Sequence, residues 1–292
     1  MTIPSSTNEI AICFFGCSFT SWPASSITYA DNFGLFFSEH YKNHFLNSSL
    51  VNKKIKILNF ANPGNANDSI FYHGTKFLNE QTKNYDKIYF ICQLTGMERI
   101  FKVGHGTSPR FRDIIIPEGS FNWLGHTEEA WYLPNKVKQK WLENFKDYTP
   151  QKHVSRFFSN LLDFQNVLKN NDKVDYRFFL GWDILTKRDN KDENSIMWHE
   201  NKKYCNINNK LIIDAYGDKK TKEKYNQIDW HKFWFFENED MKYGGLSNWV
   251  QHTLEPEHWY RDYEASDFHP SNHAHEKFCN EVLCKITKEM IQ

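Results

Sequence analysis

Short, continuous apolar runs alternate along this chain with longer helical stretches, and this alternation constrains the fold more than any other feature. Five runs have the length and the β-branched or aromatic content of buried strands; they cover residues 9–16, 54–61, 86–93, 174–182 and 209–216. A strand that is buried on both faces, as in a parallel sheet, reads as a continuous apolar run and not as an alternation. The sequence therefore predicts a mostly parallel sheet of five strands.

Helical stretches separate these runs. They cover residues 31–45, 68–82, 155–170 and 272–291, and Asp68 is of a type that caps a helix N-terminus. Strands that alternate with helices form a doubly wound sheet with helices on both faces. The expected fold is therefore a three-layer α/β/α sandwich of the flavodoxin-like type.

Two long stretches do not follow the alternation. Residues 100–150 and 183–262 are rich in aromatic, charged and Asn residues, and no linker-like Pro/Gly/Ser tract or internal repeat separates them from the rest. A chain of 292 residues is long enough to form one large domain. We therefore expect a single domain over residues 1–292, with two insertions that form a cap or a binding surface.

Charge and hydropathy argue against several classes of protein. The 36 Lys and Arg balance the 36 Asp and Glu, so a globally basic nucleic-acid binder is not expected. No apolar run reaches the 18 residues typical of a membrane-spanning helix, and the first ten residues lack the pattern of a secretory signal. We expect a cytoplasmic protein that binds neither nucleic acid nor membranes.

The six cysteines lie apart in the sequence, at positions 13, 17, 92, 205, 279 and 284. No CxxC spacing occurs, so a zinc site built on thiolates is not expected. The sequence predicts reduced, mostly buried thiols.

Gly16, Cys17 and Ser18 directly follow the first apolar run. In open α/β sheets, ligands bind at the carboxyl ends of the strands. A serine at this place can present its hydroxyl near backbone N–H groups, which stabilise developing negative charge. The alternative for the same residues is a serine that only caps a helix.

Polar residues also follow the second and third runs, at the same predicted edge. Gly64 lies in an Asn-Pro-Gly-Asn turn and lets the backbone approach a ligand, and Asn67 follows shortly after. Gln93 and Thr95 end the third run. The alternatives are an ordinary strand-to-helix turn at Gly64 and satisfied edge residues at Gln93 and Thr95.

Asp267 and His269 lie just before the last helical stretch, and a proline follows the histidine. The aspartate can orient the imidazole, which can then deprotonate a serine. A metal site formed with His273 and His275 is one alternative, and a structural cap is another. In a helix that starts near residue 271 these two histidines face different sides, which argues against the metal; no cofactor is expected.

The order of these four turns resembles that of the SGNH, or GDSL-type, hydrolases. The resemblance extends from residue 9 to about residue 100 and from about residue 265 to the end, and does not explain the middle of the chain. The family consists of three-layer α/β/α enzymes that hydrolyse or transfer acyl esters with Ser, His and Asp. An oxyanion hole is formed there by Ser, Gly and Asn.

The resemblance implies a role for each matching position. Ser18 matches the nucleophile and the first oxyanion donor, Gly64 the second donor, His269 the base and Asp267 the acid. The usual spacing of the acid and base is Asp-x-x-His, whereas this chain has Asp-x-His, as in the branch that resembles alginate acetyltransferases.

The resemblance leaves two positions open. The asparagine that follows the third strand in the family has no clear equivalent, so Gln93, Thr95 or Asn67 is expected to take its place as a donor. Cys17 occupies the position of the usual aspartate before the serine, and its side chain is expected to point away from the site. A hydrolase that uses Cys17 with a histidine is the alternative.

The expected function is therefore that of a serine ester hydrolase, an acylesterase or deacetylase, with acyl transfer as a variant. Its substrate is expected to be a small-molecule or glycan acyl ester, because aromatic residues make up 17% of the chain and can stack on sugars. The aromatic residues considered for this role are Trp123, Trp131, Trp230, Trp234, Trp249, Trp259 and Tyr260. The alternative is a non-catalytic structural or glycan-binding module in an assembly such as a virion, with a homo-oligomer or another protein as partner.

Overall fold

The computed structural model describes residues 9–17, 19–20, 54–61, 65–97, 100–101, 120–121, 149–187, 210–262 and 267–291. For residues 260–262 and 267–269 it describes the backbone alone. The predicted helix at 31–45 and the stretch 122–148 lie outside the described residues, as does Cys205.

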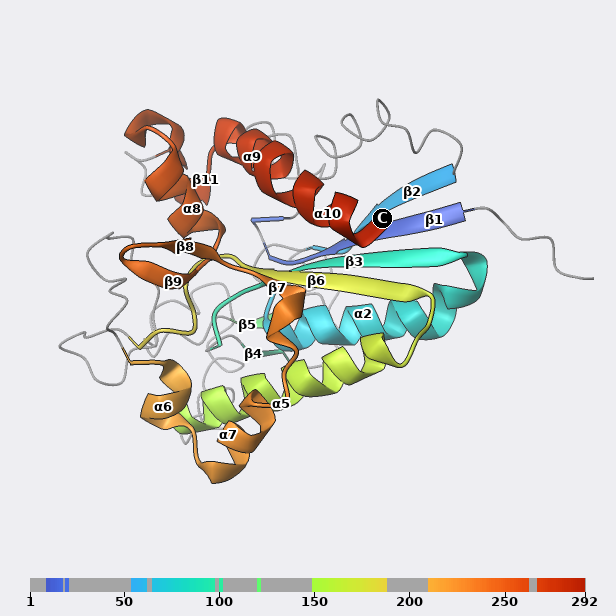
Figure 1. The fold of residues 1–292 in the computed structure, drawn as a ribbon, viewed down its shortest axis with the longest axis horizontal. Coiled ribbons are helices and arrows are strands. Elements are labelled where there is room, and N and C mark those ends of the chain that lie inside the picture. Colours follow the sequence, from blue (N-terminus) through green and yellow to red (C-terminus); the bar gives the residue numbers. More distant parts are fainter. Residues whose placement is uncertain are drawn as a thin grey trace, which may run out of the picture.

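A sheet of five parallel strands forms the centre of the molecule (Figure 1), as predicted. Its strands, in spatial order, are β2 (Lys54–Asn59), β1 (Glu9–Phe15), β3 (Lys87–Leu94), β6 (Val174–Leu180) and β7 (Phe233–Trp234). This is the flavodoxin-like order, in which the chain moves first to one side of β1 and then returns to the other. Four of the five predicted strands are confirmed.

The central strands are apolar on both faces, which explains their continuous apolar runs. Every residue of β1 from Ile10 to Phe15 is buried. The ring of Phe15 stacks between those of Phe60 and Phe90, with a centroid distance of 4.9 Å to each. Burial on both faces requires a layer of helices on each side of the sheet.

Helices cover both faces, so the predicted three-layer sandwich is confirmed (Figure 1). On one face lie α2 (Asn67–Gln81) and α5 (Pro150–Lys169), which stack Phe71 on Phe164 at 5.0 Å. On the other lies the C-terminal helix, made of α9 (Asn272–Phe278), a π-helical turn (Cys279–Leu283) and α10 (Cys284–Ile291). Phe278 of this helix packs on Phe179 of β6 at 5.5 Å.

The prediction of a strand at 209–216 is wrong. Residues Ile212–Tyr216 form the short helix α6, followed by α7 (Lys219–Tyr225). Its apolar run is too short to distinguish a buried helical turn from a strand. The fifth strand is instead β7, which lies inside the stretch 183–262 that the sequence suggests is an insertion.

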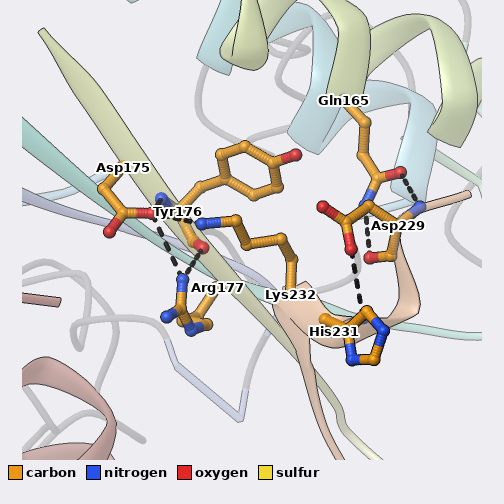
Figure 2. A network of polar contacts seen from close by, with 7 residues as sticks. All are labelled: Gln165, Asp175, Tyr176, Arg177, Asp229, His231 and Lys232. Carbon is orange, nitrogen blue, oxygen red and sulfur yellow. Dashed lines mark hydrogen bonds and ion pairs between the residues drawn. The ribbon is translucent and has the colours of Figure 1, made fainter. Parts of the chain in front are cut away.

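A cluster of charged residues attaches β7 to the amino-terminal half of β6 (Figure 2). Asp175 Oδ1 accepts hydrogen bonds from Lys232 Nζ at 2.8 Å and from Arg177 Nη1 at 3.2 Å. Burial opposes the charge of Asp175, but the hydrogen bonds and charges of these neighbours outweigh it and lower the pKa of the carboxyl group. Burial, and after it the charges of Asp229 and Asp175, raises the pKa of Tyr176 to about 12.

A buried carboxamide ties the approach to β7 to α5. Gln165 Nε2 donates to the Asp229 carbonyl at 3.2 Å, and Asp229 N donates to Gln165 Oε1 at 3.0 Å (Figure 2). The Asp175 cluster and the Gln165–Asp229 pair lie toward the end of the sheet where β6 begins (Figure 2). They therefore lie away from the carboxyl ends of the strands.

Smaller elements complete the described part of the chain. They are β4 (Ile100–Phe101) paired with β5 (Ser120–Phe121), β8 (Phe236–Asn238) paired with β9 (Met241–Gly244), α8 (Leu246–Thr253), and β10 (Tyr260–Asp262) paired with β11 (Asp267–Pro270). The five described cysteines, Cys13, Cys17, Cys92, Cys279 and Cys284, are buried and form no disulfide with one another. None of the described helices combines the length and the apolar character needed to cross a membrane.

Candidate active site

The turn that follows β1 leaves the sheet at its topological switch point. β1 lies between β2 and β3, and the chain goes from β1 to β2 before it crosses to β3. Ligand sites of doubly wound sheets form at this crevice, beside the carboxyl ends of the strands. The turn begins at Gly16 and closes with a hydrogen bond from Thr20 N to the Cys17 carbonyl at 3.0 Å.

Gln93, the penultimate residue of β3, binds this turn. Its Oε1 accepts hydrogen bonds from Cys17 N at 3.1 Å, from Cys17 Sγ at 3.3 Å and from Thr20 Oγ1 at 3.1 Å. Its Nε2 donates to the Leu94 carbonyl at 3.0 Å. The side chain has no exposed surface, so these bonds form in the interior.

Two glycines leave the space that the Gln93 carboxamide occupies. A Cβ atom on Gly16 would lie 2.8 Å from Gln93 Oε1, and one on Gly181 would lie 2.6 Å from Gln93 Nε2. Gly16 follows β1 and Gly181 follows β6, so the glycines flank β3 on both sides. Any larger residue at either place would displace the carboxamide from the turn.

Two asparagines hold the same turn from the side of β2. Asn59 Nδ2 donates to the Thr20 carbonyl, and Asn65 Nδ2 donates to the Gly16 carbonyl, each at 3.0 Å. Their roles cannot be predicted from the sequence pattern, because an asparagine after a strand is typical of any turn. Together with Gln93 they fix both ends of the turn.

Asn67 and Thr95 join the start of α2 to the turn after β3. Asn67 Oδ1 accepts from Thr95 N at 2.8 Å, and Asn67 Nδ2 donates to the Thr95 carbonyl at 2.7 Å. Both side chains are buried. Thr95 Oγ1 is buried and has no hydrogen-bond partner among the described residues. Of the three candidates for the third donor, Thr95 is therefore the one whose side-chain donor makes no hydrogen bond to a described residue.

Two of the predicted site residues, Ser18 and Gly64, lie outside the described residues. The neighbours of Ser18 are described on both sides. Cys17 is fully buried with its thiol on Gln93, and Phe19 packs edge-on against Trp182 at 5.5 Å. The thiol of Cys17 thus contacts Gln93, and the expectation that it points away from the site stays a prediction, because Ser18 lies outside the described residues.

Asp267 and His269 belong to β11, and their side chains lie outside the described atoms. Figure 1 shows β11 on the same side of the view as the carboxyl ends of β1, β3 and β6. Ser271 follows and caps α9, because its Oγ accepts from Ala274 N at 3.1 Å. The contact of this acid and base with Ser18 stays a prediction, because the side chains of all three residues lie outside the described atoms.

The histidines of α9 do not converge. The ring of His273 lies 4.5 Å from that of His258, whereas His275 is buried. Among residues whose side chains the structure describes, no group of three or more His, Cys, Asp or Glu is placed to hold a metal ion.

A buried histidine and a partly buried arginine support the turn after β3 from the α5 side. Arg156 Nη2 donates to the Met97 carbonyl at 2.8 Å, and Arg156 Nε pairs with Asp68 at 3.3 Å. Burial lowers the pKa of His153 to about 3, the Arg156 charge adds to this, and a hydrogen bond to Met97 opposes it. The prediction that Asp68 caps α2 is wrong. The helix begins at Asn67, one position before Asp68, and Ala66 occupies the cap position.

The described tryptophans pack against the core, where Trp249 is buried and Trp230, Trp234 and Trp259 are partly buried. Trp234 and Trp249 contact the Phe278 ring at 5.2 and 5.3 Å, and Trp230 contacts Tyr225 at 4.8 Å. Trp259 Nε1 donates to the Leu254 carbonyl at 2.7 Å. These residues serve packing and do not support the predicted sugar-stacking surface. Trp123, Trp131 and the side chain of Tyr260 lie outside the described residues.

Comparisons with known proteins give weak likenesses. No protein-family model matches the sequence, and no curated protein matches it significantly. Among solved structures, a single-residue variant of an acetyl xylan esterase from Geobacillus stearothermophilus is 14% identical, with 94% of each chain covered and a TM-score of 0.39. A GDSL-like lipase from Parabacteroides merdae is 15% identical (93% and 94% covered, TM-score 0.40). A lipase/acylhydrolase from Enterococcus faecalis is 10% identical (96% of each covered, TM-score 0.39).

At TM-scores of 0.40 or less we draw nothing from these likenesses. The strand order and the three layers of this chain, seen in its own structure, are those that the resemblance to the SGNH hydrolases implies.

Proposed function

We propose that the chain is a serine ester hydrolase in which Ser18 is the nucleophile, His269 the base and Asp267 the residue that orients the base. One observation carries this proposal. The turn on either side of Ser18 leaves the sheet at the switch point, and buried carboxamides of Gln93 and Asn65 hold it there. A nucleophile acts efficiently only if the scaffold fixes its position, and this turn is fixed from two neighbouring elements.

The proposed reaction has two halves. Ser18 Oγ bonds to the carbonyl carbon of the ester while its proton passes to His269. The bond between the carbonyl carbon and the alcohol oxygen then breaks, and the alcohol leaves with the proton from His269. In the second half a water molecule gives a proton to His269 while its oxygen bonds to the acyl carbon. The bond between this carbon and Ser18 Oγ then breaks, and the proton on His269 passes to Ser18 Oγ, which releases the carboxylic acid and restores Ser18.

The oxyanion donors in this proposal are the N–H groups of Ser18 and Gly64 and the hydroxyl of Thr95. Thr95 is preferred to Gln93 and Asn67 because both carboxamides already donate to backbone carbonyls in the interior. The Thr95 hydroxyl is buried and unpartnered among the described residues, so it can turn toward the developing negative charge.

The proposed substrate is an acyl ester without an assigned alcohol. A carbohydrate substrate stays a prediction, because the described tryptophans contact other side chains of the protein and Trp123 and Trp131 lie outside the described residues. Transfer of the acyl group to an alcohol in place of water uses the same residues.

The test is covalent labelling with a fluorophosphonate probe together with turnover of p-nitrophenyl acetate. We expect labelling at Ser18 in the wild type, and Ser18→Ala should lose labelling and about 10⁴-fold in kcat. Cys17→Ala is the matched control, since it changes the adjacent side chain, and it should still be labelled at Ser18.

Two results would overturn the proposal. Equal turnover by wild type and Ser18→Ala would exclude Ser18 as the nucleophile. Labelling that survives in Ser18→Ala but disappears in Cys17→Ala would transfer the role to the thiol. A wild type that is neither labelled nor active would instead indicate the non-catalytic module.

A further inference from the structure

We infer that Gln93 is a positioning residue, which sets the place of Ser18 by clamping the two ends of its turn to β3. This inference rests on the proposed function and gives Gln93 a different role from the oxyanion donor that the sequence suggests. It follows from which residues the carboxamide binds, from how completely it is buried and from the space around it.

One oxygen atom connects both ends of the turn. Gln93 Oε1 accepts from the backbone and thiol of Cys17 and from the hydroxyl of Thr20, at 3.1, 3.3 and 3.1 Å. Cys17 precedes Ser18 by one position and Thr20 follows it by two. The two ends therefore cannot move apart without breaking a bond to the same atom.

The clamp is anchored to the sheet and not to a mobile surface group. Gln93 pairs with Phe179 in the β3–β6 register, and its Nε2 bonds to the carbonyl of Leu94. Only the three side-chain torsion angles of a glutamine separate the carboxamide from a β-strand at the centre of the sheet. Side chains without exposed surface that also make several hydrogen bonds have little freedom to change rotamer.

No other described group can replace the accepting oxygen. If Gln93 loses its oxygen, Cys17 N and Thr20 Oγ1 become buried donors without an acceptor. A buried donor is satisfied by protein or by ordered water, so the turn would rearrange until each finds a new partner. Gly16 lies within this turn, and its missing side chain gives the backbone the freedom to move.

The test compares two buried glutamines that change in the same way. Gln93→Met keeps the length of the side chain and removes its hydrogen bonds. Gln165→Met does the same at the far end of β6, where the carboxamide binds the backbone of Asp229. Both variants are assayed with p-nitrophenyl acetate at a temperature at which circular dichroism shows them to be folded.

We expect kcat to fall about 10²-fold in Gln93→Met with a change in KM of less than about threefold, as for other displacements of a catalytic group. Gln165→Met should lower the unfolding temperature but leave kcat and KM near the wild-type values. Equal losses of kcat in the two variants would overturn the inference, because a loss of stability would then explain both.

A milder pair of variants covers the case in which Gln93→Met does not fold. Thr20→Val removes one of the three donors to Gln93 without a change of shape, and we expect kcat to fall about tenfold. Thr287→Val is its matched control, because the Thr287 hydroxyl is also buried but bonds to Leu283 in the C-terminal helix. Unchanged kcat in Thr20→Val would contradict the clamp.

Amide hydrogen exchange separates this inference from the proposed function. The amide of Cys17 should exchange faster in Gln93→Met than in the wild type, and Gln165→Met should leave its rate unchanged. An inactive wild type in which Cys17 shows this change would refute the proposed esterase while supporting the clamp. An active enzyme without the change would refute the clamp alone.

Discussion

Lowering the pH from 7 to 5 should destabilise the protein through His153, and the size of the effect follows from its surroundings. Only 2% of His153 is exposed, and Arg156 lies one helical turn further along α5. Burial and this charge lower the pKa of His153 in the folded protein to about 3 from an ordinary value of 6.5. The unfolded chain therefore binds a proton below pH 6.5 that the folded protein does not bind.

The sign and size of the effect follow from proton linkage. A group whose pKa is lowered on folding contributes its full stability above its unfolded pKa and loses it as the pH falls toward the folded pKa. Each pH unit in this interval changes the free energy of unfolding by about 1.4 kcal/mol. Between pH 6.5 and pH 5 His153 should therefore remove about 2 kcal/mol of stability.

The assay is urea unfolding of the wild type and of His153→Gln at both pH values. Glutamine keeps a neutral donor for the Met97 carbonyl but does not titrate. The loss of stability between pH 7 and pH 5 should be smaller in the variant by about 2 kcal/mol, while other titrating groups contribute equally to both. His231→Gln leaves His153 in place and should retain the wild-type loss. The same loss in His153→Gln as in the wild type would refute the reasoning.

Two further substitutions test the fold around the site. In Gly245→Ala, the new Cβ would press on the Leu180 carbonyl and lie 2.6 Å from Trp182 N, and these backbone atoms cannot rotate away. We expect the free energy of unfolding in urea to fall by about 3 kcal/mol. A fall below about 1 kcal/mol would contradict this packing. In Lys232→Met, the pKa of Asp175 should rise, because its closest cation is removed. A carboxyl group whose pKa is lowered on folding stabilises the folded protein above its ordinary pKa, and this stabilisation is lost as the pH falls. The free energy of unfolding of the variant should therefore be lower than that of the wild type by less than about 1 kcal/mol at pH 7, and the difference should be smallest below pH 3.

The central strands and main helices could be predicted because their signals are local. β1, β3 and β6 are buried on both faces, and such strands consist of continuous apolar residues whatever their partners. The helices α2, α5 and α9–α10 each bury one face, which gives a periodic pattern within a single segment. The layers then follow from the alternation of these elements.

β7 could not be predicted because its pairing depends on distant residues. It is two residues long and pairs with Phe178 and Phe179, more than fifty positions earlier. The hydrogen bond from Lys232 to Asp175 holds β7 in place. The aromatic residues around β7 show no strand pattern in the sequence and therefore suggest an irregular stretch. By contrast, Ile212 and Ile213 carry a strong strand signal and form a helical turn on α5, because tertiary packing overrides the propensity of a short segment.

The roles of the carboxamides could not be read from the sequence for a related reason, and their contacts change how the site is understood. Gln93 at the end of a strand suggests a group that faces a ligand, since polar residues at this edge usually do. In the folded chain its partners are Cys17 and Thr20, 76 and 73 positions earlier, and all of them are buried. A carboxamide that already bonds on both of its polar atoms gains little by turning to a substrate, because each turn would leave buried donors unsatisfied. The polar residues of this edge thus divide into a frame, formed by the partly buried Asn59 and the buried Asn65, Asn67 and Gln93, and the groups that the frame holds in place. In the proposed function only the second set, with Thr95 as its described member, acts on a substrate.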